Sequence, residues 1–388
     1  MIKITADDIF DGRKFHGPGR ALVLDENATV SALVPRSWVG EDFVKLDGIL
    51  CPGFINTHCH LELSHMKGSV PEGTGLPAFL TAVMENRTPP AADVLHSAID
   101  AAAGAMHQEG TVAVGDIANT AATVPVKRRT AHQTVWHTFV ECMGVADASA
   151  PQRLEHSMAV LAQFRQAQLP AALVPHAPYS VSPTLFRLIN GLKSNGTISI
   201  HNQESAAENE LFRHKTGPFL QFYRHFNMDA SSIGGTGSNS LPAYIPYFDQ
   251  GQTMLLVHNT FTTRQDVEAA LARDGQTYWC LCPNANLYIE GMLPDVDMLL
   301  ATPGVTITLG TDSLASNHQL SIWREIATLR QKFPHIPLET MLQWATLNGA
   351  MALGIDDRFG SFEKGKTPGV VQISGNTSRI LDLKSLFA

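Results

Sequence analysis

The chain has 388 residues, of which 44% are hydrophobic and 16% are charged, a composition that excludes a wholly disordered protein and allows a large buried core. Its formal net charge of −8 argues against nucleic acid as a partner, because binding a phosphate backbone needs clustered cations. It has no apolar run of about 18 residues and no apolar stretch like that of a signal peptide at its start, so we expect no membrane partner.

The first 50 residues predict short strands, among them residues 20–24 and 30–34. From Pro52 onward, short runs rich in Val, Ile and Thr alternate with longer stretches of helical period, the pattern of βα units around a parallel sheet. Eight strands are predicted there: 53–57, 111–115, 134–140, 172–175, 197–200, 254–257, 277–281 and 305–309. Eight strands with interleaved helices favour a closed (β/α)8 TIM barrel over an open sheet.

A further apolar run at residues 370–373 follows a turn-rich stretch, and we expect it to join the N-terminal strands. The predicted fold class is therefore α/β. A small β domain is built from both termini, residues 1–50 and 355–388, and the barrel covers residues 51–354.

Two smaller features bear on the setting of the protein. The basic run Lys127-Arg128-Arg129 is short, and we interpret it as a solvated loop and not a binding patch. The five cysteines are an odd set without the spacing of a disulfide framework, which favours a cytoplasmic protein.

Ionisable side chains follow four of the predicted strands at their C-terminal ends, where barrel enzymes carry their catalytic groups. His58 and His60 end the first strand, and the strand period of two points both imidazoles to the same side. His201 ends the fifth strand, His258 the sixth and Asp312 the eighth. Imidazoles and a carboxylate at one barrel mouth suit Zn²⁺ or Fe²⁺, with one coordination position left for water.

Other candidate residues lie close to these in sequence. Glu204 comes three residues after His201, near enough to move protons without being a ligand. Glu62 and Glu141 are candidate substrate contacts, and for Glu62 a structural role in its loop is an equal alternative. Phe79 either covers the site or begins a surface helix, and we favour the surface helix.

Four segments together resemble the amidohydrolase superfamily over nearly the whole chain. They are Pro52-Gly53-Phe54-Ile55-Asn56-Thr57-His58-Cys59-His60, His176-Ala177-Pro178-Tyr179-Ser180, His201-Asn202-Gln203-Glu204 and Gly310-Thr311-Asp312-Ser313-Leu314-Ala315-Ser316-Asn317. More narrowly, they resemble the branch of cytosine, guanine, S-adenosylhomocysteine and aminodeoxyfutalosine deaminases and triazine hydrolases. The motif set is specific for the superfamily and much less so for the substrate.

The resemblance implies a site for one divalent metal ion, with Zn²⁺ favoured over Fe²⁺. Its ligands would be His58, His60, His201 and Asp312. Glu204 and His258 would handle protons, and His258 and Asp312 would orient the attacking water. Binuclear relatives carry a lysine at the end of strand four, whereas this strand ends in Pro175-His176, which predicts a single ion. His176 would then face the substrate, the alternative being a supporting hydrogen-bonded role.

The expected function is that of a metal-dependent deaminase. Activated water replaces the exocyclic amine of a purine, pyrimidine or related heterocycle, and ammonia is released. An adenine-bearing nucleoside such as aminodeoxyfutalosine is an expected substrate, and a homodimer the expected assembly. Two alternatives stay open: an amidohydrolase acting on a cyclic amide or another C–N bond, and a non-catalytic barrel scaffold.

Overall fold

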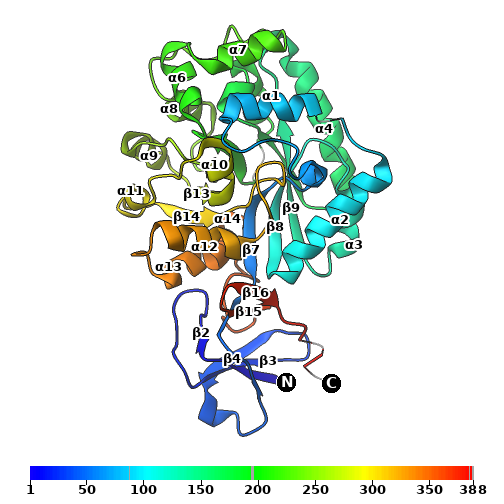
Figure 1. Cartoon of the computed structure of the whole chain (residues 1–388), viewed down its shortest axis with the longest axis vertical. Coiled ribbons are helices and arrows are strands. Elements are labelled where there is room, and N and C mark those ends of the chain that lie inside the picture. Colours follow the sequence, from blue (N-terminus) through cyan, green and yellow to red (C-terminus); the bar gives the residue numbers. More distant parts are fainter. Residues whose placement is uncertain (87, 194–195, 384, 387–388) are drawn as a thin grey trace.

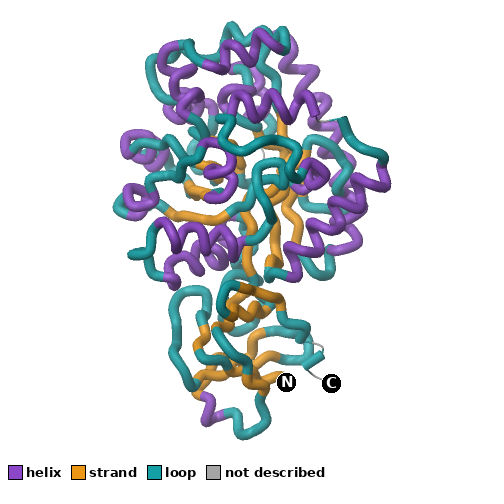
Figure 2. Tube along the Cα trace, viewed as in Figure 1, coloured by secondary structure: helices purple, strands orange, loops and turns teal. Residues whose placement is uncertain are grey.

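The computed structural model describes residues 1–86, 88–193, 196–383 and 385–386, so the predicted end of the small domain at residue 388 lies outside the described residues. Figure 1 shows a large part in which helices surround strands, and below it a smaller part that carries both chain ends. In Figure 2 the strands of the large part lie inside its helices, whereas the smaller part consists mainly of strands and loops.

Eight parallel strands form the centre of the large part, and each overlaps the range predicted for it. They are β7 (Phe54–Cys59), β8 (Thr111–Ala118), β9 (Val135–Cys142), β10 (Ala171–Pro175), β11 (Ile198–Asn202), β12 (Met254–His258), β13 (Thr277–Leu281) and β14 (Thr306–Leu309). They pair in two four-stranded sheets, in the orders β10-β9-β8-β7 and β11-β12-β13-β14. The prediction of eight strands is confirmed.

The two parallel sheets meet at both of their outer edges. Between β14 and β7, the Thr311 N–H donates to the His58 carbonyl at 2.9 Å and the His60 N–H to the Asp312 carbonyl at 3.3 Å. Between β10 and β11, the His201 N–H donates to the His176 carbonyl at 3.0 Å. The strands therefore have a TIM-barrel-like α/β arrangement, whose carboxyl ends all open to one side.

Helices surround these strands or lie over their carboxyl ends, and a few of them begin at a side-chain cap. They are α1 (Leu76–Asn86), α2 (Ala92–Gln108), α3 (Val124–Thr130), α4 (Ala150–Gln166), α5 (Pro183–Gly191), α6 (Ala206–His214), α7 (Pro218–His225), α8 (Ser240–Tyr244), α9 (Arg264–Leu271), α10 (Pro283–Glu290), α11 (Val296–Leu300), α12 (Ile322–Lys332), α13 (Leu338–Gln343) and α14 (Gly349–Ala352). Ser182 caps α5, and Thr263 with Asp266 forms a capping box at α9. Within the described ranges, none of the helices has the length and apolar character needed to cross a membrane.

The smaller part consists of two four-stranded sheets built from both ends of the chain. Its strands are β1 (Ile2–Thr5), β2 (Asp8–Ile9), β3 (Arg20–Leu24), β4 (Val30–Pro35), β5 (Val44–Lys45), β6 (Ile49–Pro52), β15 (Val370–Ser374) and β16 (Thr377–Ile380). The sheet orders are β4-β3-β1-β5 and β16-β15-β6-β2. Since β6 leads directly into β7, this part lies at the amino ends of the parallel strands, opposite their carboxyl ends (Figure 1).

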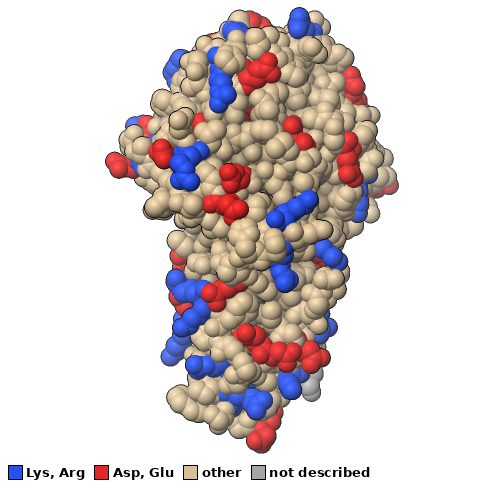
Figure 3. Space-filling model, turned by 60° about the vertical axis from the view of Figure 1, so that its left-hand side comes forward, with Lys and Arg blue, Asp and Glu red and all other residues tan. Residues whose placement is uncertain are grey.

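The interpretation of the run at 127–129 as a solvated loop is wrong, because all three residues lie in a helix and only Arg128 and Arg129 are exposed. Lys127 lies in α3 and is fully buried, with its ammonium group against Asp116 of β8. A lysine with an internal charge partner can be buried, and sequence spacing does not reveal such a partner. On the face of the molecule drawn in Figure 3, the Lys and Arg side chains are interspersed with Asp and Glu side chains.

Candidate metal centre and cavity

Four predicted ligands meet at the carboxyl ends of the parallel strands. His58 and His60 come from the end of β7, His201 from β11, and Asp312 from the segment after β14. One donor atom of each lies within 4.8 Å of the others, and all four residues are buried. The structure therefore brings together the ligand set that the sequence predicted.

The chemistry of these donors fits a divalent cation. Nδ1 of His201 lies 2.8 Å from the carbonyl oxygen of His176, which can only accept, so Nδ1 carries the proton and Nε2 offers a lone pair. That Nε2 lies 3.2 Å from Nε2 of His60. Among the described residues, neither ring nitrogen of the buried His58 has a hydrogen-bond partner. Converging nitrogen donors without protein partners suit a metal ion such as Zn²⁺.

Asp312 completes the donor set with one oxygen and is held by the other. Its Oδ1 lies 3.4 Å from Nε2 of His60 and 3.6 Å from Nε2 of His58. Its Oδ2 accepts a 2.5 Å hydrogen bond from the Ser316 hydroxyl. Burial opposes ionisation, but the neighbouring His58 and His60 outweigh it and lower the pKa of the Asp312 carboxyl. The carboxylate is therefore charged and oriented for a cation.

Glu204 and His258 form a second pair beside the ligands. Oε1 of Glu204 lies 3.6 Å from Nε2 of His258. Burial, and then the charge of Asp312, raise the pKa of Glu204 well above its usual range, so this carboxyl is suited to hold a proton near neutral pH. Burial lowers the pKa of His258 to about 4, and its Nδ1 lies 2.8 Å from Oδ1 of Asn286 on α10. The ring is therefore neutral, with Nε2 turned towards Glu204.

The backbone of this region adopts an uncommon conformation. Four non-glycine residues at or just after the ends of β11, β12 and β14 have positive φ: Gln203 at 46°, His258 at 76°, Asn259 at 61° and Asp312 at 57°. Side chains with a Cβ rarely occupy this left-handed region, and such strain gathers at functional sites. Here it coincides with His258, Asp312 and the residue before Glu204.

A second group of possible donors is less suited to a metal. Glu141, His176 and His201 also place one donor atom each within 4.8 Å of the others. However, Nδ1 of His201, which lies 3.4 Å from Oε1 of Glu141, donates to the His176 carbonyl and is not available as a ligand. This geometry favours one ion over two.

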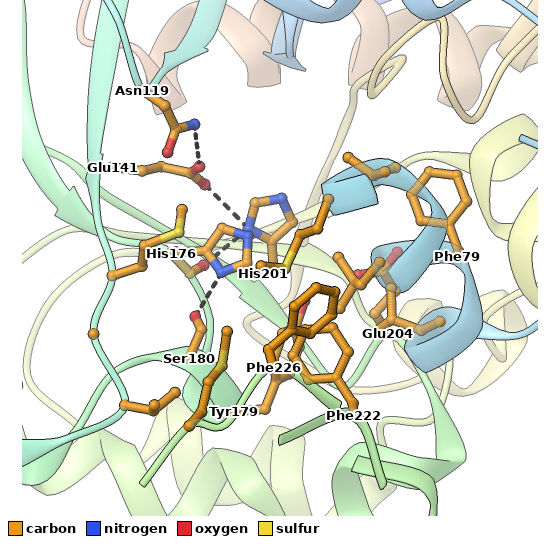
Figure 4. A pocket seen from close by; sticks show the side chains of 18 of the residues that line it. Phe79, Asn119, Glu141, His176, Tyr179, Ser180, His201, Glu204, Phe222 and Phe226 are labelled. Atoms are coloured by element: carbon orange, nitrogen blue, oxygen red, sulfur yellow. Dashed lines mark hydrogen bonds and ion pairs between the residues drawn. The ribbon is translucent and has the colours of Figure 1, made fainter. Parts of the chain in front are cut away.

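A cavity of about 590 Å³ opens onto the metal centre, a size that suits a small organic ligand. We call the end lined by His60, His201, Glu204, His258 and Asp312 the inner end. The outer end is lined by Leu76, Phe79, Leu80, Val83, Met84, Phe222, Phe226 and Met228. Figure 4 shows Asn119, Glu141 and His176 on one side of this space and the rings of Phe79, Phe222 and Phe226 on the other, with Glu204 drawn near the rings.

The polar side is formed by Asn119 after β8, Glu141 near the end of β9 and His176 after β10, all of which line the cavity. The Asn119 amide donates to Oε2 of Glu141 at 3.1 Å, and Nδ1 of His176 lies 2.6 Å from the Ser180 hydroxyl (Figure 4). We refer to Asn119, Glu141 and His176 as the polar wall. Two of the three predicted substrate contacts therefore face the cavity.

Glu62, the third predicted contact, lies behind the polar wall. It is buried but is not among the described residues that line the cavity. Its carboxylate accepts hydrogen bonds from the backbone N–H groups of Asn119 and Thr120, at 3.0 and 3.1 Å. Glu62 thus supports the loop that carries Asn119, in line with the structural alternative.

The outer end contains a residue that the sequence assigned otherwise. Phe79 was expected at the start of a surface helix, yet it lies in α1 with only 7% of its surface exposed and lines the cavity. The sequence could not place it, because the apolar surface that covers it comes partly from α7, far along the chain.

Sequence reasoning also missed Asn119, Asn286 and Ser316. Asn286 contacts His258, 28 residues away in the sequence, and Asn119 contacts Glu141, 22 residues away. At such separations the sequence pattern does not indicate that two residues meet. Ser316 was detectable, because it lies only four residues after Asp312 in the quoted Gly310–Asn317 segment.

Comparison with known proteins identifies a family. The sequence model described as "Amidohydrolase family" matches residues 49–382. This range includes all eight parallel strands and every ionisable residue of the inner end.

Individual relatives are similar over most of their length. An adenosine deaminase of Helicobacter pylori is 29% identical over 323 residues, which are 80% of this chain and 76% of that protein. An aminodeoxyfutalosine deaminase of a Nitratiruptor species is 26% identical over 326 residues, 80% of this chain and 75% of that protein. The crystal structure of Helicobacter pylori aminofutalosine deaminase with methylthio-coformycin shares the fold, with a TM-score of 0.81, 24% identity and coverage of 97% of this chain and 93% of that one.

Proposed function

The chain belongs to the amidohydrolase family, and from this premise we propose that it is a metal-dependent deaminase of an adenine-bearing nucleoside or a related amino-substituted heterocycle. The observation that carries the proposal is the inner end of the cavity. There Glu204 and His258 lie beside the cluster of three imidazoles and Asp312, at the closed end of a space that fits a small molecule.

The metal ion would be held by His58, His60, His201 and Asp312, and when bound it lowers the pKa of a water molecule towards neutrality. Glu204 takes a proton from the attacking water and delivers it to a ring nitrogen of the substrate, which makes the amine-bearing carbon more electrophilic. His258 orients the water through its Nε2. Water supplies the new oxygen. Once Glu204 has released the first proton to the ring, it can carry the second proton of the water to the exocyclic amine, so that the C–N bond breaks and ammonia leaves.

The cavity supports a substrate larger than a bare ring. The heterocycle would lie against the inner end, with His176 and Glu141 of the polar wall in contact with its polar edge or a sugar. The apolar outer end would then cover a substituent that extends towards the cavity mouth. An adenine-bearing nucleoside such as aminodeoxyfutalosine fits this division, and the curated relatives act on substrates of this kind.

The test is ammonia release from a panel of aminated purines, pyrimidines, nucleosides and pterins by the zinc-loaded protein. We expect release from an adenine nucleoside, loss of release on chelation, and recovery when Zn²⁺ is returned. Ring opening without ammonia would favour the alternative of cyclic-amide hydrolysis. A metal-loaded protein that binds nucleosides without turnover would favour a non-catalytic scaffold.

The proposal also covers the closure of the barrel, the small domain, the identity of the metal, the location and the assembly. The eight strands form one closed (β/α)8 barrel over residues 51–354, supported by the hydrogen bonds that join β14 to β7 and β10 to β11. Residues 1–50 and 355–388 form a small β domain, supported by the pairing of β15 with β6. The metal is a single Zn²⁺, with Fe²⁺ as the second candidate, and the enzyme is a cytoplasmic homodimer.

A further inference from the structure

A buried ion pair lies behind the metal centre and takes no part in the proposed chemistry. Lys127 of α3 and Asp116 of β8 are both fully buried, and Nζ of the lysine lies 2.6 Å from Oδ2 of the aspartate. The same Nζ donates to Oγ1 of Thr138 at 2.8 Å and lies 4.8 Å from the ring centre of Phe164. The lysine charge is therefore matched entirely inside the protein, by elements of two neighbouring βα units, β8–α3 and β9–α4.

Stability alone does not explain such a pair. Two charges lose their hydration on burial, and replacing a buried ion pair with apolar side chains of similar volume is often neutral or stabilising. The pairing of Asp116 within the sheet does not call for a charge either, because Thr138, the residue opposite it on β9, is uncharged. The pair therefore points to a task performed by the carboxylate.

That task is visible at the other carboxylate oxygen. Oδ1 of Asp116 accepts a hydrogen bond of 2.8 Å from the backbone N–H of Leu61, the residue directly after His60. On the far side of the same segment, the Thr311 N–H donates to the His58 carbonyl at 2.9 Å. The segment that carries two metal ligands is thus held from the last strand on one side and by Asp116 on the other.

We propose that Asp116 and Lys127 are positioning residues of the metal centre. Lys127 fixes the Asp116 carboxylate, and this carboxylate fixes the Leu61 backbone, which sets the direction in which the His60 imidazole points. Groups that orient metal ligands in this way typically account for about 10–100-fold in metal affinity. The proposal rests on the metal centre of the proposed function.

Two neutral double variants isolate the hydrogen bond to Leu61 from the charge pair. Asp116→Asn with Lys127→Met keeps an oxygen acceptor for the Leu61 N–H. Asp116→Leu with Lys127→Met keeps the branched shape, with bulkier methyl groups, but has no acceptor. The readouts are the Zn²⁺ dissociation constant, from competition with a chromophoric chelator, and the melting temperature of the metal-free protein.

We expect the Leu/Met variant to bind Zn²⁺ about tenfold more weakly than the wild type or worse, and the Asn/Met variant, which keeps the acceptor but lacks the lysine that fixes it, to lose clearly less affinity. The metal-free melting temperatures of the two variants should be similar. Wild-type affinity in the Leu/Met variant would overturn the proposal, as would an equal loss in both variants. A wild-type protein that binds no Zn²⁺ would overturn the metal centre itself, which is a separate failure.

A third variant covers the case in which Leu/Met does not fold. Asp116→Glu keeps the charge pair with Lys127 but moves the carboxylate by one methylene, which displaces the acceptor from Leu61. We expect weaker Zn²⁺ binding by about tenfold, a folded circular dichroism spectrum, and recovery of affinity on reversion to Asp. Unchanged affinity in this variant would contradict a positioning role.

Discussion

The inner and outer ends of the cavity are lined by side chains of different chemistry. The inner end consists of buried ionisable side chains at strand ends, among them Asp312, which is held by Ser316, and His258, which is held by Asn286. The outer end consists of apolar side chains of α1, α7 and the loops beside them, and Met84 there is 39% exposed. Under the proposed function, the strand ends would determine the reaction, whereas the helices and loops of the outer end would determine the substrate.

The sharpest way to test this division is to remove the proton carrier of the inner end without touching a metal ligand. Glu204→Gln should lower kcat by about 10³-fold, because an amide cannot carry a proton from water to the substrate. Zinc content should stay at the wild-type level, since Glu204 is not a ligand. Turnover within tenfold of the wild type in a fully metallated variant would contradict the assigned role.

A smaller loss is expected when a support of the inner end is removed. Asn286→Ala frees Nδ1 of His258 from its 2.8 Å partner, so the ring can rotate away from Glu204, and we expect kcat to fall by about 10–100-fold. The control is Asn284→Ala on the same helix, where the side chain accepts from Thr328 instead. Equal kcat values for the two variants, measured at saturating substrate, would show that His258 does not need this anchor.

At the outer end we expect an effect on substrate choice and not on chemistry. Phe79→Ala removes a buried ring, so KM should rise by about tenfold for adenine nucleosides with a large apolar substituent, while kcat on a small unsubstituted nucleoside stays the same. Met84→Ala, at a more exposed position, should change KM less. A fall in kcat for every substrate alike would break the proposed separation of the two ends.

The smallest effect on kcat is expected from replacing Glu325, a buried carboxyl behind the inner end, whose main effect should be on stability. Burial raises the pKa of Glu325 to about 8, so the folded protein keeps this proton to higher pH than the unfolded chain does. The free energy of unfolding should therefore fall as pH rises from about 5 to 8. Glu325→Gln cannot ionise, so this decline should become shallower, as measured by urea unfolding at several pH values with kcat as a control. An unchanged slope would assign the decline to other groups.

The strands and the metal ligands were predictable because each signal is local. A β-rich run followed by an ionisable residue defines both a strand and its functional end, and His58 and His60 show the strand period directly. The residues that hold these ligands were not predictable in the same way. Asp116 meets Leu61 across 55 residues, and Lys127 in a basic run looked like a surface residue until its buried partner was known.

The outer end was the least predictable part, for a related reason. Phe79 has the same local pattern whether its ring faces solvent or a cavity, and only the packing of α1 beside the aromatic residues of α7 decides between them. Glu62 illustrates the converse, because it follows the two histidines directly and yet turns to the loop at Asn119. Proximity in sequence did not place it in the cavity.

The left-handed residues at the strand ends have a consequence for directed evolution. Gln203, His258, Asn259 and Asp312 hold backbone conformations that glycine would adopt without strain, so the surrounding fold supplies free energy to keep side chains there. A selection for heat resistance alone would favour relief of that strain and would tend to erode turnover. Libraries meant to raise the melting temperature should leave these four codons fixed and draw their gains from the small β sheets instead.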